Sequence, residues 1–543
     1  MSYAAGKARR TRTIVAALAG VGALALPAGA SAQAGAEAEP PFTPAQASVQ
    51  LEAAVEALSG ADPAAAHPTD ELRDLAAAIP YLAGRERREA RAILARPPAD
   101  KGGTEPFGAE WPENAMEHEL STAHFVVHWP QVPGCTAPAQ GCDEPDLTDA
   151  SGGGGGPPNG IPDYVDRVAM AAEASYSAQN GDLGWPDPKP DGEAGGDDRI
   201  DIYISDICDE VSAGGACLFG YASPDDTSAQ CHQAPFECFA YLVLDNDYQP
   251  AEFGSYSDQL IPMRVTTAHE YNHILQFGID ARQDGWMFES TAVWSEEQVF
   301  PGDDDWLFYL RIWKRTTQQP ITSFGAGAGL KVYGSGVWNH WLHLGAGYGP
   351  DVVLDAWLGS QQTKPKHFAV GAYDRAIKQH GGRGFSHEFG RFAAATAEWQ
   401  VGDGDFSADH PDDDVPDEQQ FPDVKRHGEL ARGGRAESFK LDHTAYRLLR
   451  VKPRGANKVR LRVRARRGVR TAIALVGRDG PATTGELKTK FSYAPKGGKD
   501  SVALKNARSF ERITAVVVNA DGRVKGNSRR YTRNNERYRV SLR

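Results

Sequence analysis

HEYNH, residues 269–273, places two histidines four positions apart, with a glutamate directly after the first. Positions i and i+4 of an α-helix lie one above the other on the same face, so His269 and His273 can present two imidazoles to one metal ion. In zinc hydrolases with this pattern, the glutamate accepts a proton from the water that zinc activates. The motif therefore predicts a helix that carries two zinc ligands and a general base, Glu270.

The residues around the motif favour a helix. Pro262 suits a first helical turn, and Gly278 offers a stop. Apolar contacts would come from Val265, Ala268, Leu275 and Phe277. Two surface histidines on an ordinary helix are the alternative interpretation.

A catalytic zinc site needs a third protein ligand and one open coordination position. A metzincin would place a histidine or an aspartate six residues beyond His273, but Ile279 stands there. Glu289, in a second helix-like stretch at residues 286–297, is the preferred third ligand, because two histidines and one glutamate match the thermolysin-type set. The other candidates, in order, are Glu296, then Glu297 and Asp280.

The oxyanion of a tetrahedral intermediate needs a hydrogen-bond donor besides the metal, commonly Tyr, His or Arg. Tyr333, which precedes Gly334-Ser335-Gly336, is the preferred candidate, and His340 and His343 are alternatives. A tyrosine in the core, or a histidine on a helix surface, would explain these residues without catalysis.

HEYNHILQFG and WMFESTAVWSEE, with NGIPDYVD and LVLDNDY upstream, resemble a family of secreted bacterial zinc metallopeptidases of the gluzincin type. The resemblance covers residues 107–399. It implies a zincin-like catalytic domain in which His269, His273 and Glu289 bind zinc and Glu270 is the base. The chain departs from thermolysin in having fewer residues, fifteen, between the second histidine and Glu289, and Val293 where an aspartate would support a ligand histidine.

The expected fold class is α+β: a zincin-like catalytic domain with a mixed sheet and an active-site helix, followed by a small C-terminal β-sandwich. Residues 124–129, 200–204 and 239–244 read as strands, with His124 and His128 as strand residues, not ligands. One of the later two strands is placed to bind substrate by strand addition. Short β-rich runs predict the sandwich, at residues 445–451, 458–463, 471–476, 513–519 and 538–542.

Charge and composition divide the chain. Residues 425–543 carry 32 Lys and Arg against 9 Asp and Glu, whereas the preceding residues carry 26 against 63. The predicted domains are a helical N-terminal region or propeptide at residues 35–105, a zincin-like domain at 106–402, an acidic linker at 403–428 and a basic β-sandwich at 429–543. The basic domain could contact anionic cell-surface material, although a solvated basic face is the simpler explanation, and no nucleic-acid partner is expected.

The N-terminus predicts export. A basic stretch at residues 7–12, an apolar run at 14–26 and the small residues Ala30-Ser31-Ala32 form a signal peptide, assigned to residues 1–34. No later run reaches about 18 apolar residues, so no membrane span is expected after signal removal. All six cysteines lie between Cys135 and Cys238, and their spacing predicts three local disulfides. Close spacing favours the local pairs Cys135–Cys142, Cys208–Cys217 and Cys231–Cys238, although six cysteines permit fifteen pairings and the sequence does not choose among them.

Asp146, Asp149, Asn159 and Asp163 are oxygen donors around a Gly-rich loop, a set that calcium selects. Their spacing is not that of an EF-hand, so helix capping by Asn159 and Asp163 is an equal alternative.

The sequence thus predicts a secreted zinc-dependent metallopeptidase that hydrolyses a protein or peptide substrate. A secreted adhesion or cell-wall-binding protein that keeps a non-catalytic zincin-like scaffold is the second hypothesis, and zinc hydrolysis of a non-peptide ester or amide is a third.

Overall fold

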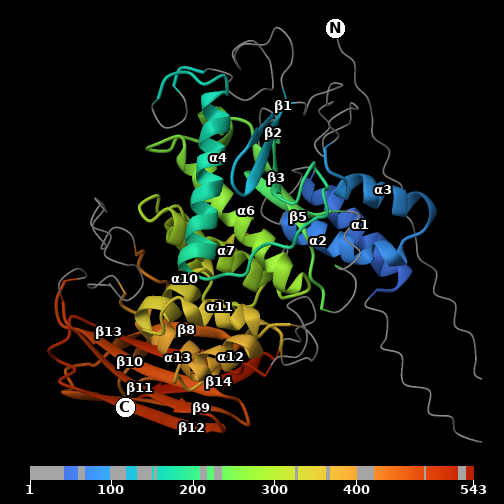
Figure 1. The fold of residues 1–543 in the computed structure, drawn as a ribbon. Coiled ribbons are helices and arrows are strands. Elements are labelled where there is room, and N and C mark those ends of the chain that lie inside the picture. The colour runs from blue at the N-terminus through green and yellow to red at the C-terminus, as the bar shows by residue number, and fades with distance from the viewer. Residues whose placement is uncertain are drawn as a thin grey trace, which may run out of the picture. The chain divides into compact units, whose positions relative to one another are not determined.

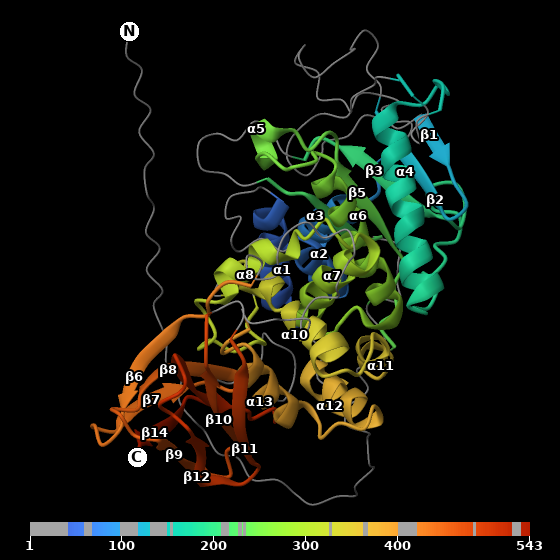
Figure 2. The ribbon, with the colours of Figure 1, turned by 90° about the vertical axis from the view of Figure 1, so that its left-hand side faces the viewer.

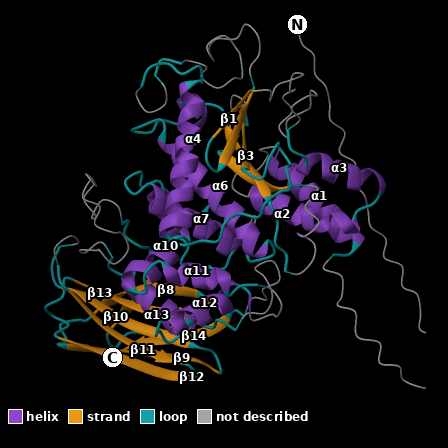
Figure 3. Ribbon diagram, in the orientation of Figure 1, coloured by secondary structure: helices purple, strands orange, loops and turns teal. Residues whose placement is uncertain are grey.

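The computed structural model describes residues 42–58, 68–97, 118–130, 149–151, 156–207, 217–225, 231, 235–324, 328–361, 367–399, 421–481, 485–523 and 534–543. All of them belong to one compact unit, Phe42–Arg543. The predicted signal peptide and most of the predicted acidic linker lie outside the described residues. The fold is α+β, with one mixed sheet among helices and two further sheets near the C-terminus (Figures 1 and 3).

The first sheet has the strand order β1-β2-β3-β5-β4. Strands β2, β3 and β5 are parallel, and the edge strands β1 and β4 are antiparallel to their neighbours. The strand bounds are His118–Ser121 for β1, Phe125–Trp129 for β2, Ile200–Ser205 for β3, Gly220–Pro224 for β4 and Ala240–Asp245 for β5. The three predicted strands are therefore present. However, β3 and β5 are paired on both sides, so the expectation that one of them accepts a substrate strand is wrong; the edge strands are β1 and, beside β5, β4.

Alternating side chains give this sheet two different apolar faces. Ile202, Leu242 and Leu244 face the core that holds helices α4 and α6, and Tyr203, Tyr241 and Val243 face a second core with helices α1–α3. Strands buried on both faces read as continuous apolar runs, which explains why these three segments were identifiable in the sequence.

The second core is formed by the N-terminal helices α1, Pro44–Leu58, α2, Pro68–Ala78, and α3, Gly84–Leu94. Helix-favouring stretches at residues 45–58 and 71–94 predict two helices here, and the first is present. The long helical stretch expected at residues 71–94 is instead two helices, because the chain turns through a short 3₁₀ segment, Ile79–Tyr81, that contains Pro80.

The opposite face of the sheet packs against α4, Asp163–Tyr176, and α6, Ile261–Asp280. Helix α7, Gly285–Val299, lies beside α6, as Figure 2 also shows. Helix α6 begins as predicted, with Pro262 in its first turn, but it runs two residues beyond Gly278.

The remaining helices lie between α7 and the C-terminal sheets in sequence. They are α8 Trp306–Trp313, α9 Lys331–Gly334, α10 Val337–His340, the π-helical turn Trp341–Gly345, α11 Asp351–Leu358, α12 Ala369–Gln379 and α13 Phe385–Ala395; the short α5, Pro250–Phe253, precedes α6. The sequence also predicts helices at residues 333–344 and 351–358; the first is divided among α9, α10 and the π-helical turn, whereas α11 spans the second. No helix in the described part of the chain is long and apolar enough to cross a membrane.

Two sheets follow, with the orders β11-β10-β13-β8-β6 and β12-β9-β14-β7, and residues of both line a shared apolar core. The strands are β6 Arg426–Ala431, β7 Glu437–Leu441, β8 Ala445–Lys452, β9 Lys458–Arg467, β10 Thr471–Arg478, β11 Leu487–Ala494, β12 Gly497–Lys505, β13 Arg512–Asn519 and β14 Glu536–Leu542. The other face of the first of these sheets packs on α13, beside β10 and β11 in Figure 2. At this junction the fully buried carboxylate of Glu398 pairs with Arg426 at 2.8 Å and with Arg512 at 2.7 Å.

Lys331 is a buried lysine near the same junction. Its ammonium donates a hydrogen bond to the carbonyl oxygen of Pro320 at 2.6 Å, and burial lowers its pKa from 10.5 to about 7. Because the unfolded chain binds this proton more tightly than the folded chain, the free energy of unfolding should rise with pH between about 7 and 10.5.

We expect Lys331→Met to remove this dependence. The variant should be more stable than the wild type at pH 7, by on the order of 3 kcal/mol, and the difference should shrink towards pH 10. Urea unfolding at several pH values measures it. A difference that stays constant with pH would contradict the prediction.

Candidate metal centre

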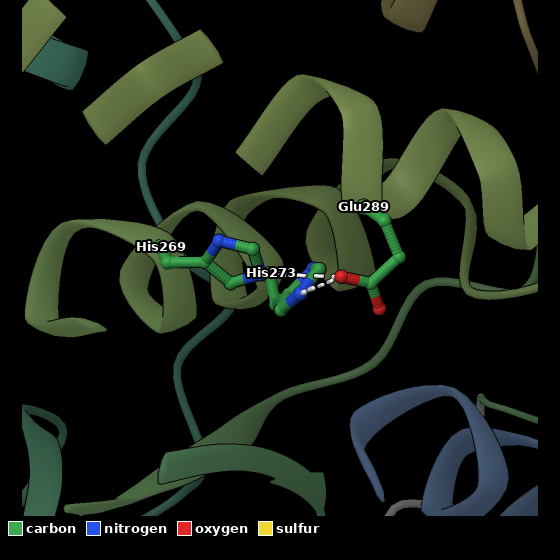
Figure 4. Close-up of side chains that lie close together, drawn as sticks. All are labelled: His269, His273 and Glu289. Atoms are coloured by element: carbon green, nitrogen blue, oxygen red, sulfur yellow. Dashed lines mark hydrogen bonds and ion pairs between the residues drawn. The ribbon is translucent and has the colours of Figure 1, made fainter. Parts of the chain in front are cut away.

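Helices α6 and α7 bring three predicted ligands together. The ligand atoms of His269, His273 and Glu289 all lie within 4.8 Å of one another (Figure 4). Both histidines come from α6 and Glu289 comes from α7. The pairing of α6 with α7 therefore assembles the group, since neither helix alone supplies it.

Both imidazoles approach the same carboxylate oxygen. Glu289 Oε2 lies 3.3 Å from His269 Nε2 and 4.0 Å from His273 Nε2. The two rings are 4.8 Å apart and nearly perpendicular, at 80°. Atoms that bind one tetrahedral zinc ion at about 2.0–2.1 Å are separated by roughly 3.3 Å, so small side-chain adjustments would complete such a site.

The other nitrogen of each ring is held by a hydrogen-bond acceptor. His269 Nδ1 lies 2.6 Å from Glu296 Oε1, and His273 Nδ1 lies 2.8 Å from Gln276 Oε1. A ring whose Nδ1–H donates to an acceptor can offer its Nε2 lone pair to a metal. Both rings are thus set to bind through Nε2.

The orientation of the Gln276 amide is fixed by its surroundings. Its Nε2 donates to the carbonyl oxygen of Phe288 at 3.1 Å and to Asn272 Oδ1, so its Oε1 must face His273. Asn272 in turn donates to Gln179 at 2.8 Å. This chain of buried amides determines the tautomer of His273.

Negative charge is concentrated around the two rings. Burial raises the pKa of Glu270 and of Glu296 to about 7. Burial lowers the pKa of His273 to about 3, whereas at His269 the hydrogen bonds to Glu289 and Glu296 outweigh burial and raise the pKa well above its usual value. The His269 imidazolium lies between two carboxylates. A divalent cation can take the place of its Nε2 proton.

The donor set therefore fits zinc. Two imidazole nitrogens and one carboxylate oxygen are ligands that zinc accepts in hydrolases, and each imidazole has an orienting partner. All three ligands are at most 7% exposed, and a buried cluster of carboxylates is stabilised by a divalent cation.

Glu270, the predicted base, contacts the N-terminal helices. Its Oε2 accepts a hydrogen bond of 3.0 Å from the hydroxyl of Thr69, at the start of α2. The same hydroxyl accepts a hydrogen bond of 3.0 Å from the backbone N–H of Ala222 in the edge strand β4. Thr69 thus bridges the base and the open edge of the sheet, a link that the sequence did not reveal.

The side of α2 that meets the site is buried. Thr69 is 4% exposed and Glu270 is 6% exposed. Arg73, one turn after Thr69, is ion-paired with Asp70, and its guanidinium lies over the ring of Phe288 at 4.7 Å from the centroid. Helix α2 therefore contacts both α6 and α7 beside the candidate ligands.

Tyr333, the predicted oxyanion donor, lies near the ligands. Its ring is 5.9 Å from that of His269 and 5.1 Å from that of Tyr309. Burial raises its pKa well above 10, which keeps the hydroxyl protonated and able to donate. The alternatives have packing contacts instead: His340 stacks on Trp306 at 4.0 Å, and the ring of His343 lies 6.0 Å from that of Trp294.

The reserve ligand Glu296 takes the orienting position beside His269, which the sequence had left unassigned. Glu297 and Asp280 are buried but are not members of the ligand group in the described residues. Val293, where an aspartate was considered, is a core residue.

The residues considered for calcium make loop contacts. Asp149 accepts hydrogen bonds from the N–H groups of Asn159 at 3.2 Å and Gly160 at 2.7 Å, and Asp163 accepts one from Ser151 at 3.1 Å. Asp146 lies outside the described residues. The cap position of α4 is Pro162, which has no side-chain cap, so Asn159 and Asp163 close the loop instead of capping the helix.

A second cluster of carboxylates, which the sequence analysis did not predict, lies at the end of strand β5. Carboxylate oxygens of Asp245, Asp247 and Glu252 lie within 4.8 Å of one another, after strand β5. Asp245 accepts the backbone N–H groups of Asp247 and Tyr248 at 3.1 and 2.9 Å, so part of this cluster serves to close the turn.

The disulfide Cys231–Cys238 is present, as predicted. Cys217 is disulfide-bonded as well, while Cys135, Cys142 and Cys208 lie outside the described residues. The histidines of the β2 segment are hydrogen-bonded to carboxylates, His124 to Glu173 and His128 to Asp201, each at 2.7 Å, and neither belongs to the ligand group.

The different positions of Glu289 and Glu296 lead to different expected effects on metal binding. Glu289→Ala should abolish stoichiometric zinc, because it removes a ligand. Glu296→Gln should retain zinc with an affinity about 10–100-fold lower, because it removes only the orienting carboxylate. Chelator competition with metal analysis measures both, and Glu119→Gln on the exposed strand β1 is the control. Full zinc affinity in Glu289→Ala would overturn the ligand assignment.

No protein-family model matches the chain, and no curated protein matches it. Functional assignment therefore rests on the arrangement of the residues themselves.

Proposed function

We propose that the chain is a zinc-dependent peptidase with a zincin-like, gluzincin-type catalytic unit. The convergence of His269, His273 and Glu289 beside Glu270 carries this proposal. Secretion, expected from the N-terminal sequence, is part of the proposal, and disulfide bonding agrees with an oxidising compartment.

A zinc ion held by these three residues would lower the pKa of a water molecule and polarise the carbonyl of a peptide bond. Glu270, which follows the first ligand on α6, is the base that would accept the proton from water and pass it to the leaving amine. Tyr333 would donate its hydroxyl proton as a hydrogen bond to the developing oxyanion. His269 and His273 are kept in the required tautomer by Glu296 and Gln276.

Strand β4 is the place for an extended substrate. It is an edge strand, and the N–H of Ala222 is directed to Thr69 and not to a neighbouring strand. An extended peptide can add to such an edge through backbone hydrogen bonds. The Ala222 amide and the Glu270 carboxylate share one hydroxyl partner, so a peptide on β4 would lie beside the base.

In the structure, helix α2 lies along this edge of β4. We therefore propose that the N-terminal helices α1–α3 hold the enzyme in a latent form, in keeping with the propeptide interpretation of residues 35–105. Thr69 satisfies both the base and the edge amide, and the surrounding apolar core of α1–α3 holds α2 in position. A substrate must displace this first turn of α2 before it reaches the metal ligands.

The second hypothesis, a non-catalytic adhesion scaffold, has one feature in its favour: the ligands and the base are almost fully buried. The two proposals differ in whether Glu270 matters for turnover.

Glu270→Gln tests the proposed chemistry. The amide cannot accept the proton, so peptide hydrolysis should fall by at least about 100-fold while zinc stoichiometry is unchanged. Cleavage of a fluorogenic peptide library and metal analysis give the two readouts, with Glu119→Gln as the control. Absence of any peptide cleavage that depends on Glu270, with zinc bound, would favour the scaffold.

Thr69→Val tests the latency. A buried hydrogen bond contributes about 1 kcal/mol, so losing the hydroxyl should raise peptide turnover about fivefold. Thr69→Glu, which places a second carboxylate against Glu270, should raise it further. Thr489→Val, on the exposed part of strand β11 and away from α1–α3, is the matched control. A fall in turnover in Thr69→Val would instead make Thr69 a positioning residue for the base.

A further inference from the structure

The sheet β12-β9-β14-β7 carries a group of arginines, called here the arginine face, on the side away from the apolar core. Its members line one hollow of about 680 Å³. They are exposed and come from the turn after β6, from β9 and from the end of the chain: Arg432, Arg462, Arg464, Arg539 and Arg543.

The strand register places like charges directly opposite one another. Arg464 of β9 faces Lys499 of β12 on one side and Arg539 of β14 on the other. Like charges in opposed cross-strand positions destabilise a sheet. Fold stability therefore does not explain this row.

Some other arginines in the two sheets have acidic partners. Arg466 pairs with Glu536, and Arg426 and Arg512 pair with Glu398. Within the described residues, the five side chains of the arginine face have no ion pair to a carboxylate. Their positive charge faces solvent without compensation.

The opposite side of the same strands accounts for the packing. Leu461 and Val463 of β9 and Val540 of β14 are at most 2% exposed and belong to the core shared with the other sheet. Because the inward residues hold the sheet together, neutral polar residues would serve as well at the outward positions. The arginines point to recognition of something outside the chain.

The chemistry of the face indicates closely spaced anionic groups. A guanidinium binds sulfate, phosphate or carboxylate through two parallel hydrogen bonds. Alternate residues on one strand are about 7 Å apart, and neighbouring strands about 5 Å, so the face presents cations at the spacing of substituents along a charged polymer. Ser501 and Ser541, opposite Arg462, add hydroxyl groups that can contact a sugar.

Two observations argue against nucleic acid. The outward positions of β9 and β14 are Lys, Arg and Ser without an aromatic residue, whereas single-stranded nucleic acids are bound by stacking on aromatic side chains. Duplex DNA is read by an element that enters a groove, and these residues lie on the face of a sheet.

We propose that the arginine face binds an anionic glycopolymer, a polysaccharide that carries sulfate, phosphate or carboxylate groups. This goes beyond the proposed peptidase activity and does not depend on it. Residues before 425 carry 63 Asp and Glu against 26 Lys and Arg, so such a polymer is repelled by the rest of the chain and is directed to this face.

The full-length protein can be tested with dextran sulfate and with uncharged dextran, which share one backbone. We expect binding to dextran sulfate alone. Arg464→Gln with Arg539→Gln should weaken it about tenfold or more and reduce the slope of log affinity against log salt by about 2. The matched control, Arg88→Gln with Arg91→Gln on the exposed side of α3, changes the net charge equally and should leave binding unchanged.

Thermal unfolding shows whether the double variant is folded; it should be at least as stable as the wild type, because it relieves repulsion at Lys499. Equal affinity of the folded double variant and the wild type would overturn the proposal. An equal loss in the α3 control would overturn it too, since net charge alone would then explain binding. Tighter binding of polyuridylate than of dextran sulfate at the same salt would show that the face is a nucleic-acid site.

Discussion

The contact between His269 and Glu296 is the constraint on which the proposed metal site depends. Glu296 lies seven residues after Glu289, two turns along α7, so one face of this helix supplies both a ligand and the group that orients another ligand. A rotation of α7 against α6 would therefore remove both at once. The apolar packing between the two helices, which includes Phe277 against Phe288 at 5.6 Å, fixes that rotation and so fixes the chemistry.

The same packing explains why the site is enclosed. Phe288 faces α6 through Phe277 and receives the guanidinium of Arg73 from α2, so α2, α6 and α7 meet around one ring. Of these three helices, α2 packs on the opposite face of the first sheet. The hydroxyl of its Thr69 donates a hydrogen bond to Glu270. Access to the candidate ligands is coupled to the position of α2, because its Thr69 is hydrogen-bonded to Glu270 and to the N–H of Ala222.

Local periodicity was sufficient to predict helix α6, helix α7 and the three side chains, His269, His273 and Glu289, that meet between them. The orienting residues also had a local signal, since Gln276 is one turn after His273 and Glu296 two turns after Glu289, but only the relative rotation of the helices shows which carboxylate meets which ring. Thr69 had no signal, because it is 201 residues from Glu270. The hairpin β11–β12 was missed because β11 is half exposed and lacks an apolar alternation.

The two sites that we associate with function, the buried candidate metal centre and the arginine face, have opposite charge. Around the candidate ligands, the carboxylates of Glu270, Glu289 and Glu296 are buried together, which favours binding of a cation. Raised pKa values at His269, Glu270 and Glu296 mean that bound protons offset part of this negative charge. On the arginine face, the cross-strand neighbours of Arg464 are also positively charged, which favours binding of an anion. Each site brings charges of one sign close together, and this repulsion lowers the stability of the folded state. Residues that raise the free energy of the folded state are the ones whose role must be sought in binding.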